Sequence, residues 1–234
     1  MTTKSAGLID RYFYFIMSMV IAAVVIYGFS HTINENLIHP AYPRPLVLYF
    51  HAAIFAGWVV LLITQSALIR TRNLRLHRKL GLCALSLAIA LPTIGIMTGV
   101  AMARFNTQHG STDAPEFLIV PLFDMVAFSL VVGLAITWRK KPEYHRRLMF
   151  LATCALTIAA FNRFPATIVP DNWGYAGVDA LILLGVGRDF FVTRRVHPVY
   201  LYGLPLMIVG QVLTMYIYLT KQPEWMVIAR RIIG

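Results

Sequence analysis

A few polar and ionisable side chains interrupt the apolar stretches of this sequence and could carry chemistry. They are one histidine, two acids, one asparagine and one arginine: His51, Asp124, Asn162, Arg163 and Asp179. Charged groups are costly inside hydrocarbon, so such residues face the interior of a bundle or a wet cavity. Counting inward from the expected helix ends at about 1.5 Å per residue places all of them roughly 6–11 Å deep, near the same side.

Two arrangements of these residues remain open. In the first, Arg163 is held by Asp124 or Asp179, and the ion pair only fastens the bundle. In the second, the groups line a polar pocket, open to the outside, that binds a small ligand, an ion or a cofactor. The pocket arrangement predicts that Arg163 approaches Asp124 or Asp179 within about 4 Å, with His51 facing the same interior space. The formal charge of such a pocket is −1 with His51 neutral and zero with His51 protonated, so a proton-coupled role would be physically sensible.

Trp58 joins the candidate site because it shares a helical stripe with His51. The residues of this stripe recur at three- and four-residue steps: His51, Phe55, Trp58, Leu62 and Gln65. Such spacing places side chains on one face of a helix. The stripe is typical of an ordinary packing face, and it is also compatible with a pocket wall.

The histidines allow haem b as one possible cofactor, with His51 as an axial ligand. Haem needs two axial ligands, or one ligand and an open face. His31 and His109 are the possible partners of His51, but neither lies clearly within an apolar stretch at its depth. No metal site is predicted, because His31, His39, His51 and His109 lack the i, i+4 spacing of a helical metal pair.

The composition indicates a membrane protein. Hydrophobic residues make up 58% of the 234 positions and charged residues 13%, whereas soluble domains carry about 25% charge. Lys and Arg number 21 against 10 Asp and Glu, and they gather in short blocks between apolar stretches. This pattern favours contact with anionic lipid headgroups and argues against nucleic acid as a partner. Cys83 and Cys154 lie inside apolar stretches and are expected to be packing residues.

Seven apolar stretches are long enough to cross a bilayer as helices, which needs about 20 residues. They are residues 12–30, 46–69, 79–103, 117–138, 146–168, 175–193 and 198–219. Their continuous apolarity favours helices over the alternating strands of a barrel. We therefore expect an all-α bundle of seven transmembrane helices, forming a single transmembrane domain over residues 1–234. The segment 223–233 is too short to span and is expected to be a helix at the outer interface.

The distribution of Lys and Arg predicts the orientation. Basic residues concentrate in the N-terminal segment, with Lys4 and Arg11, and in the links near 70–79, 139–147 and 194–195. The opposite segments hold far fewer. The basic side is expected to be cytoplasmic, which places the N-terminus inside and the C-terminus outside. The first span is expected to be an uncleaved anchor, since no clear cleavage site follows it.

Two basic links share a short motif that carries a resemblance. They read His-Arg-Lys-Leu-Gly at 77–81 and His-Arg-Arg-Leu-Met at 145–149. With these links the chain resembles uncharacterised bacterial seven-span inner-membrane proteins, which implies a location in the bacterial inner (plasma) membrane. It is also distantly similar to the cytochrome b561-type haem proteins, in which paired histidines on separate helices hold haem. The sequence departs from that pairing.

Three functions fit the sequence. The first is a binding or accessory subunit of a larger membrane complex, because the chain has little mass outside its spans and no strong catalytic pattern. The second is a haem- or quinone-linked redox protein that uses His51. The third is a proton-coupled small-molecule carrier that uses Asp124, Arg163 and Asp179. The expected partners are the lipid bilayer and other membrane subunits.

Overall fold

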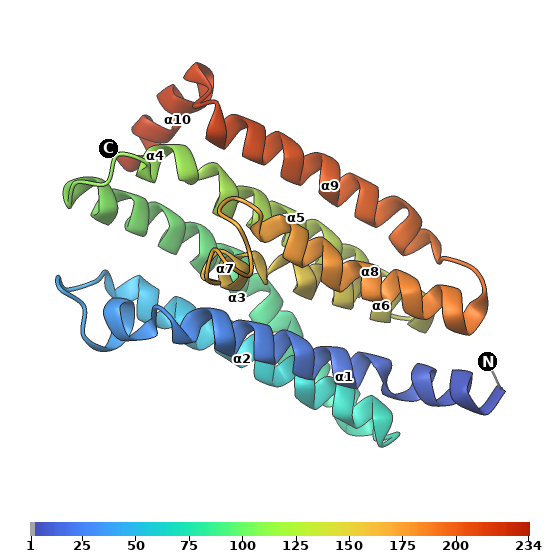
Figure 1. Cartoon of the computed structure of the whole chain (residues 1–234). Coiled ribbons are helices and arrows are strands. Elements are labelled where there is room, and N and C mark those ends of the chain that lie inside the picture. The colour runs from blue at the N-terminus through green and yellow to red at the C-terminus, as the bar shows by residue number, and fades with distance from the viewer. Residues whose placement is uncertain (1–2) are drawn as a thin grey trace.

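The computed structural model describes the backbone of residues 3–234 and the side chains of residues 11–234. Lys4, which contributes to the expected orientation, lies outside the described side chains. All regular structure in residues 3–234 is helical, with no strand, so the all-α prediction is confirmed for this part of the chain. Figure 1 shows the long helices side by side, with the start of α1 and the C-terminus at opposite ends of the bundle.

The helices follow one another with short connections. Their bounds are α1 Thr3–Ser30, η1 Asn34–Ile38, α2 Leu46–Arg70, α3 Leu74–Gln108, α4 Ala114–Phe117, α5 Ile119–Thr137, α6 Pro142–Ala155, α7 Ile158–Phe161, α8 Gly174–Thr193, α9 Pro198–Leu219 and α10 Pro223–Ile233. The element η1 is a single turn of π-helix. This form is rare in proteins overall, and where it occurs it is often found at a functional site. It lies with α4 and α10 at one end of the bundle, which we call the α10 end.

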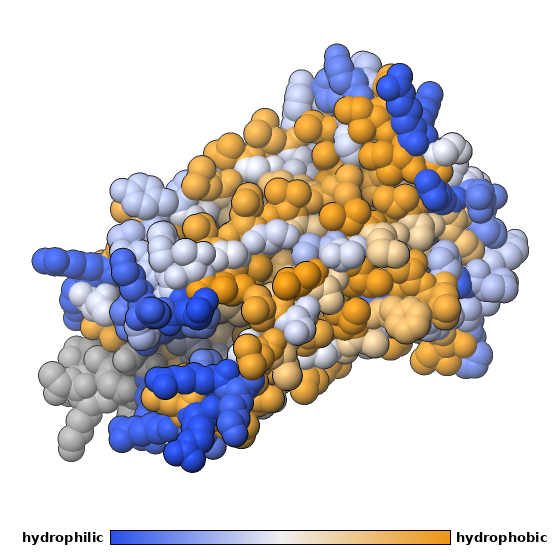
Figure 2. All heavy atoms as spheres, turned by 180° about the vertical axis from the view of Figure 1, so that it is seen from behind, coloured by the Kyte–Doolittle hydropathy of each residue, from blue (hydrophilic) through white to orange (hydrophobic). Residues whose placement is uncertain are grey.

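Five helices of the described chain are long and apolar enough to cross a membrane. They are Arg11–Ser30, Leu46–Arg70, Leu74–Gln108, Ala114–Thr137 and Pro198–Leu219. Many large apolar side chains on these helices are exposed, including Val60 and Leu206. Figure 2 shows a broad apolar band across one face of the molecule, with hydrophilic residues gathered at both ends of that face. Such a surface suits lipid and is compatible with an integral membrane protein.

The other two expected spans differ from the sequence-based expectation. The stretch 146–168 is not one helix: α6 ends at Ala155, and α7 is a single turn that ends at Phe161. The hydroxyl of Thr157 donates to the carbonyl of Cys154 at 2.6 Å, which draws the chain into a tight turn at the break. The stretch 175–193 corresponds to a continuous helix, α8, but that helix carries three charges: Asp179, Arg188 and Asp189. By length and composition, therefore, neither counts as a spanning helix.

The packing of α1 and α7 brings distant parts of the chain together at the α10 end. Helix α1 contacts α2, α7 and α8, while α5 contacts α3, α6 and α9. A Cβ at Gly28 of α1 would overlap the backbone carbonyl of Ala160 in α7, so glycine is required for this close approach. The break between α6 and α7 thus places the residues that follow, 162–164, against the end of α1.

Candidate ligand cavity

A cavity of about 830 Å³ lies at the α10 end, with walls from α2, α3, α5, α7 and the segments around η1 and residues 169–175. Four of the six predicted site residues line it: His51, Asp124, Asn162 and Arg163. The cavity reaches the surface beside the exposed loop residue Asn172. Its volume falls within the range of small-molecule sites, about 300–1,000 Å³.

Two arginines line this cavity and are held by neutral groups. Arg163 donates from Nε to the hydroxyl of Thr32 at 3.2 Å and from Nη1 to the carbonyl of Ala159. Its guanidinium carbon lies 4.4 Å from the centre of the Phe29 ring. Among the described residues Arg163 forms no ion pair.

Arg44 is the second arginine, and it comes from the link before α2. Its Nη2 donates to the side-chain oxygen of Asn36 at 3.0 Å, and its guanidinium lies 4.8 Å from the centre of the Phe105 ring. Its Nε is buried and has no hydrogen-bond partner within the described part of the chain. No carboxylate of the described residues pairs with it either.

His51 lines the same cavity and carries an unsatisfied nitrogen. Its ring stacks on Phe55, with centroids 4.0 Å apart and planes inclined by 25°. Its Nδ1 is buried and has no hydrogen-bond partner among the described residues. A buried polar atom without a partner loses its hydration uncompensated, so a ligand that bonds to it would gain binding energy.

Asp124 and Asn162 are positioned by the start of α8. The hydroxyl of Tyr175 donates to Oδ1 of Asp124 at 2.9 Å, and both side chains are buried. A Cβ at Gly174 would overlap Oδ1 of Asn162, so this glycine allows Asn162 to lie against the first turn of α8. The beginning of α8 therefore fixes two walls of the cavity.

Several expected features of the site are not found. The predicted ion pair of Arg163 with Asp124 or Asp179 is wrong, because each of the three groups is bonded elsewhere. Asp179 does not line the cavity; it accepts from Nε2 of Gln211 on α9 at 3.2 Å. Trp58 does not line it either, since its indole donates to the hydroxyl of Thr153 at 3.3 Å and its ring packs edge-on against Phe128.

The other histidines named as ligand partners of His51 lie outside the cavity lining. A ring nitrogen of His31 bonds to the carbonyl of Tyr27 at 2.8 Å, and one of His109 bonds to the carbonyl of Phe105 at 2.7 Å. His51 is thus the one histidine that lines this cavity. The lining offers one axial ligand of this type, where the cytochrome b561-type pattern needs two.

Helix α4 lines the cavity near its end, and α10 packs against α4 from outside the lining. Nζ of Lys221 lies 3.2 Å from Oε1 of Glu116, and the hydrogen bond between them raises the pKa of Lys221 above its usual value. The indole of Trp225 donates to the carbonyl of Glu116 at 3.2 Å. Arg104 of α3 donates to the carbonyls of Ile232 and Ile233, both at 2.7 Å. These contacts fix α4, whose residues Ala114 and Phe117 line the cavity.

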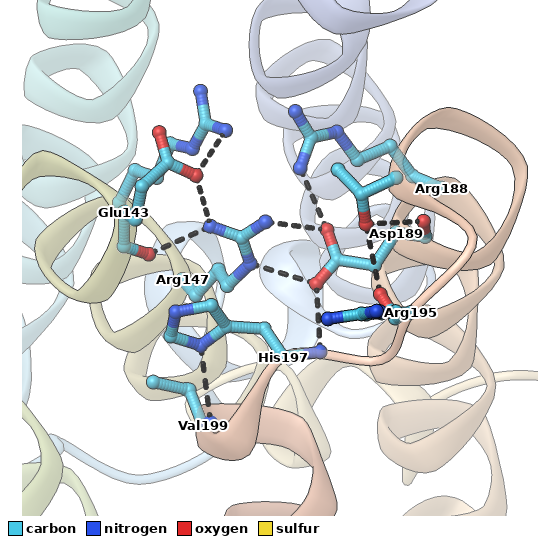
Figure 3. A network of polar contacts seen from close by, with 9 residues as sticks. Glu143, Arg147, Arg188, Asp189, Arg195, His197 and Val199 are labelled. Carbon is cyan, nitrogen blue, oxygen red and sulfur yellow. Dashed lines mark hydrogen bonds and ion pairs between the residues drawn. The ribbon is translucent and has the colours of Figure 1, made fainter.

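A second polar cluster lies at the opposite end of the bundle, and Figure 3 shows how its side chains converge on Asp189. Arg147 of α6 donates from Nε and Nη2 to the two oxygens of Asp189, at 2.8 and 2.7 Å. Nη1 of Arg188 donates to Oδ1 of Asp189 at 2.6 Å. Asp189 is 0% exposed and Arg147 is 1% exposed. This cluster joins α6 to α8 through fully buried charges.

Two titratable groups at the edge of this cluster have shifted pKa values. Partial burial acts to raise the pKa of Glu143, but hydrogen bonds and charges from Arg147 and Arg146 outweigh it and hold that pKa below its usual value. Burial, reinforced by the nearby charge of Arg147, lowers the pKa of His197. The Nδ1 atom of His197 accepts from the backbone N–H of Val199 at 3.2 Å, so the neutral ring caps α9.

Sequence reasoning missed Arg44 and Tyr175 in the cavity and Asp189 in the second cluster. Arg44 follows a proline-rich link and reads as an interfacial charge. Tyr175 stands at the very start of its apolar stretch, where tyrosine is common at a membrane interface. Asp189 did leave a signal, because it is an acid within an apolar helix and directly follows Arg188.

Comparisons with protein-family models, with curated proteins and with solved structures found no match for this chain. The chemistry of the cavity is therefore inferred from the side chains that line it. It combines cationic donors from Arg44 and Arg163, the ring of His51, the amide of Asn162 and the carboxyl group of Asp124, next to apolar wall residues such as Met102. This arrangement can bind and orient a small molecule.

Proposed function

We propose that this protein is a multi-pass inner-membrane protein that binds a small molecule in the cavity at the α10 end. We further propose that it acts as a binding or accessory subunit of a larger membrane complex. The cavity carries the first proposal: about 830 Å³, bounded by several helices, with buried unpartnered nitrogens on Arg44 and His51. Convergent polar groups in an otherwise apolar pocket are typical of a ligand site.

For the topology we propose seven crossings, with the N-terminus in the cytoplasm and the C-terminus outside. In this arrangement α6 with α7 forms one crossing and α8 another, in addition to the five long apolar helices. The course of the chain in Figure 1 supports it, since α5, α6, α8 and α9 run alternately between the two ends of the bundle. The basic links near 70–79, 139–147 and 194–195 would then all face the cytoplasm.

The proposed orientation opens the cavity to the outside of the cell and places α10 at the outer interface. Helix α10 has a buried Ala229 and exposed Arg230 and Arg231, which suits a helix that lies along a membrane surface. A location in the bacterial inner membrane agrees with the basic cytoplasmic links. In this setting a ligand would enter from the outer side, beside Asn172.

A proton-coupled carrier is the second candidate, and one observation favours it. Asp124 is buried at the cavity wall, where Tyr175 is its hydrogen-bond donor, and it shares the cavity with His51 and Arg163. A haem-linked role has less support, because His51 is the one histidine in the lining. Uptake of a substrate by liposomes that contain the purified protein, abolished in Asp124→Asn, would favour the carrier over the accessory subunit.

Cysteine labelling tests the water-filled, outward-facing cavity that the proposal requires. The background is Cys83→Ser, which removes the exposed natural thiol, while Cys154 is fully buried. His51→Cys lines the cavity, whereas the matched control Phe50→Cys lies one residue away at nearly the same depth, is 57% exposed on the apolar surface and does not line the cavity. A membrane-impermeant maleimide added to intact spheroplasts should label the first and spare the second, because the reagent reacts with a hydrated thiolate.

Two results would contradict the proposal. Labelling of His51→Cys only in inverted vesicles would place the cavity mouth on the cytoplasmic side. Equal labelling of both variants would show that water reaches position 50 as well as position 51. The labelling would then give no support for a water-filled cavity at position 51. For the accessory role, purification in a mild detergent should retain a membrane partner in fixed stoichiometry.

A further inference from the structure

The charges of the cavity point to the chemical class of its ligand. We propose that the cavity binds an organic anion, whose carboxylate or phosphate group lies between Arg44 and Arg163 and whose apolar body lies along the wall formed by α3 and α5. This inference rests on the proposed ligand-binding function. Guanidinium groups match the planar, bidentate geometry of carboxylate and phosphate oxygens better than any other side chain.

The first argument is that both arginines lack a carboxylate partner within the described chain, although each is partly buried. Arg163 bonds to a hydroxyl and a carbonyl, and Arg44 bonds to an amide oxygen. A guanidinium that is withdrawn from water and bonded only to neutral groups keeps its full positive charge without compensation. An anionic ligand would supply the missing charge.

The second argument is a contrast within the same molecule. At the opposite end of the bundle, Arg147 and Arg188 are also buried, and there the chain supplies Asp189, which bonds to both. Asp124 could in principle have served Arg163 in the same way. Instead its Oδ1 accepts from Tyr175, and no ion pair joins it to Arg163 or Arg44 among the described residues.

The third argument is that a single turn of the chain holds both arginines. Arg163 bonds to the side chain of Thr32, and Arg44 bonds to the side chain of Asn36. Both the backbone N–H and the side-chain amide of Asn36 donate to the carbonyl of Thr32 at 3.0 Å. The two guanidinium groups are thus anchored on Thr32, just before η1, and on Asn36 within it, and the hydrogen bonds between these two residues place both groups on the same side of the cavity.

The remaining lining completes an amphipathic site. His51 and Arg44 both line this part of the cavity, and each carries a buried nitrogen without a partner among the described residues. Beyond them the wall is apolar, with Met102 and Leu118. A ligand with one anionic group and an apolar body would satisfy both parts.

Binding of small probes to the purified full-length protein tests the anion. The probes are benzoate and phenyl phosphate, with benzyl alcohol as the neutral match, each at the same ionic strength in a neutral detergent. We expect the two anions, and not the alcohol, to raise the unfolding temperature, because a ligand that binds the native state stabilises it. Arg44→Gln and Arg163→Gln should each weaken anion binding roughly 10- to 100-fold, the usual contribution of a charged hydrogen bond.

Two controls separate lost binding from lost structure. Arg230→Gln removes an exposed arginine of the same end of the bundle that does not line the cavity, and it should leave anion binding unchanged. Arg163→Lys keeps the charge and should retain part of the affinity. If Arg163→Gln fails to fold, Arg44→Gln decides the matter, since its side chain comes from a link rather than from a helix.

The anion could be a soluble metabolite-like acid or a phospholipid headgroup, and the same variants distinguish the two sources. Protein reconstituted in phosphatidylcholine vesicles, with and without phosphatidylglycerol, is purified again and its bound lipid is measured. Retention of phosphatidylglycerol that is lost in Arg44→Gln identifies a lipid headgroup. Stabilisation by benzoate without lipid retention identifies a soluble anion.

Other outcomes overturn the inference. If benzyl alcohol stabilises the protein as well as benzoate does, the cavity binds ligands but does not select an anion, and the proposed function survives. If neither anion nor phosphatidylglycerol binds, or if Arg44→Gln and Arg163→Gln bind as the unchanged protein does, the anion site is wrong. The labelling of His51→Cys then decides separately whether the cavity itself is accessible.

Discussion

Asp189 accepts hydrogen bonds from Arg147 and Arg188 in the fully buried cluster at the end of the bundle opposite α10. Buried ion pairs such as these are uncommon, because the cost of removing the charged groups from water offsets much of their mutual attraction. Removal of one partner is far more damaging than the absence of the whole pair, since it strands the remaining charge. The cluster therefore acts as an all-or-none connection between α6 and α8.

Asp189→Asn should destabilise the protein strongly. The substitution removes the carboxylate that Arg147 and Arg188 share. Glu143 still pairs with Arg147, but a broken buried pair costs about 3–5 kcal/mol. The free energy of unfolding in detergent, measured by denaturant titration, checks this. The control is Asp171→Asn, which neutralises an exposed loop acid and should change stability by less than about 0.5 kcal/mol. Equal effects of the two substitutions would show that the cluster contributes nothing specific.

Tyr175→Phe should weaken the cavity wall without removing any charge. The hydroxyl of Tyr175 is the donor to the buried Asp124, and a buried acceptor left without its donor costs about 1–3 kcal/mol. We expect lower thermal stability, together with altered ligand or probe binding in the cavity. Tyr202→Phe, at an exposed tyrosine of α9, is the matched control. Unchanged stability of Tyr175→Phe would mean that Asp124 finds another donor, such as water.

At the scale of single elements, α9 begins at a histidine cap whose ionisation should make stability depend on pH. The neutral ring of His197 accepts from the backbone N–H of Val199, and its pKa in the folded protein is lowered by burial and by Arg147. At pH well above 6.5 both folded and unfolded states hold the ring neutral. As pH falls below 6.5, the unfolded state takes up the proton more readily than the folded state, so folding stability decreases.

His197→Asn should reduce this acid sensitivity. Asparagine keeps a side-chain acceptor at the start of α9 and is a favoured capping residue, but it does not titrate. The unfolding temperature of each protein is measured between pH 7.5 and 5.5, and the decrease should be smaller in the variant. The comparison is a difference, so the titration of the other histidines cancels. An identical decrease in both proteins would rule out His197 as a contributor.

The elements also show how far the sequence alone predicts this fold. Apolar stretches near 46–69 and 198–219 coincide closely with α2 and α9, because continuous apolarity and flanking prolines mark helix ends well. The break between α6 and α7 left no such mark, since it depends on a hydroxyl of Thr157 that bonds to a local carbonyl. A threonine inside an apolar stretch is compatible with an unbroken helix, and packing against α1 decides between the two.

The sequence pointed to the residues of the candidate site but not to the directions of their side chains. Counting residues predicts that His51, Asp124 and Arg163 lie at one level, and the three line the same cavity. Depth does not specify which way a side chain points around its helix. Asp124 turns toward Tyr175 and Asp179 turns toward Gln211, so neither reaches Arg163. That direction is set by how the helices pack together, which no single helix pattern contains.

At the scale of the whole molecule, the number of crossings follows from one loop. Both a seven-span and a five-span chain would place the C-terminus outside if the N-terminus is cytoplasmic, because both numbers are odd. Among the links between helices, only the loop between α7 and α8 lies on different sides of the membrane in the two topologies. If α6 with α7 crosses the membrane, residues 165–173 lie outside; if only the five long apolar helices cross, these residues stay on the cytoplasmic side.

Labelling of Asp171→Cys in the full-length chain distinguishes the two topologies. The position is exposed in the loop before α8 and lines the cavity mouth. In the Cys83→Ser background, an impermeant maleimide should label it in intact spheroplasts, because the polar residues Asp171 and Asn172 favour water on the outer side. Lys140→Cys, exposed in the basic link between α5 and α6, should be labelled only after the membrane is opened. Protection of position 171 until lysis would leave α6, α7 and α8 on the cytoplasmic side. It would also remove the outward-facing cavity, since the loop that includes Asp171 and the end of α2 that carries His51 would then lie on opposite sides of the membrane.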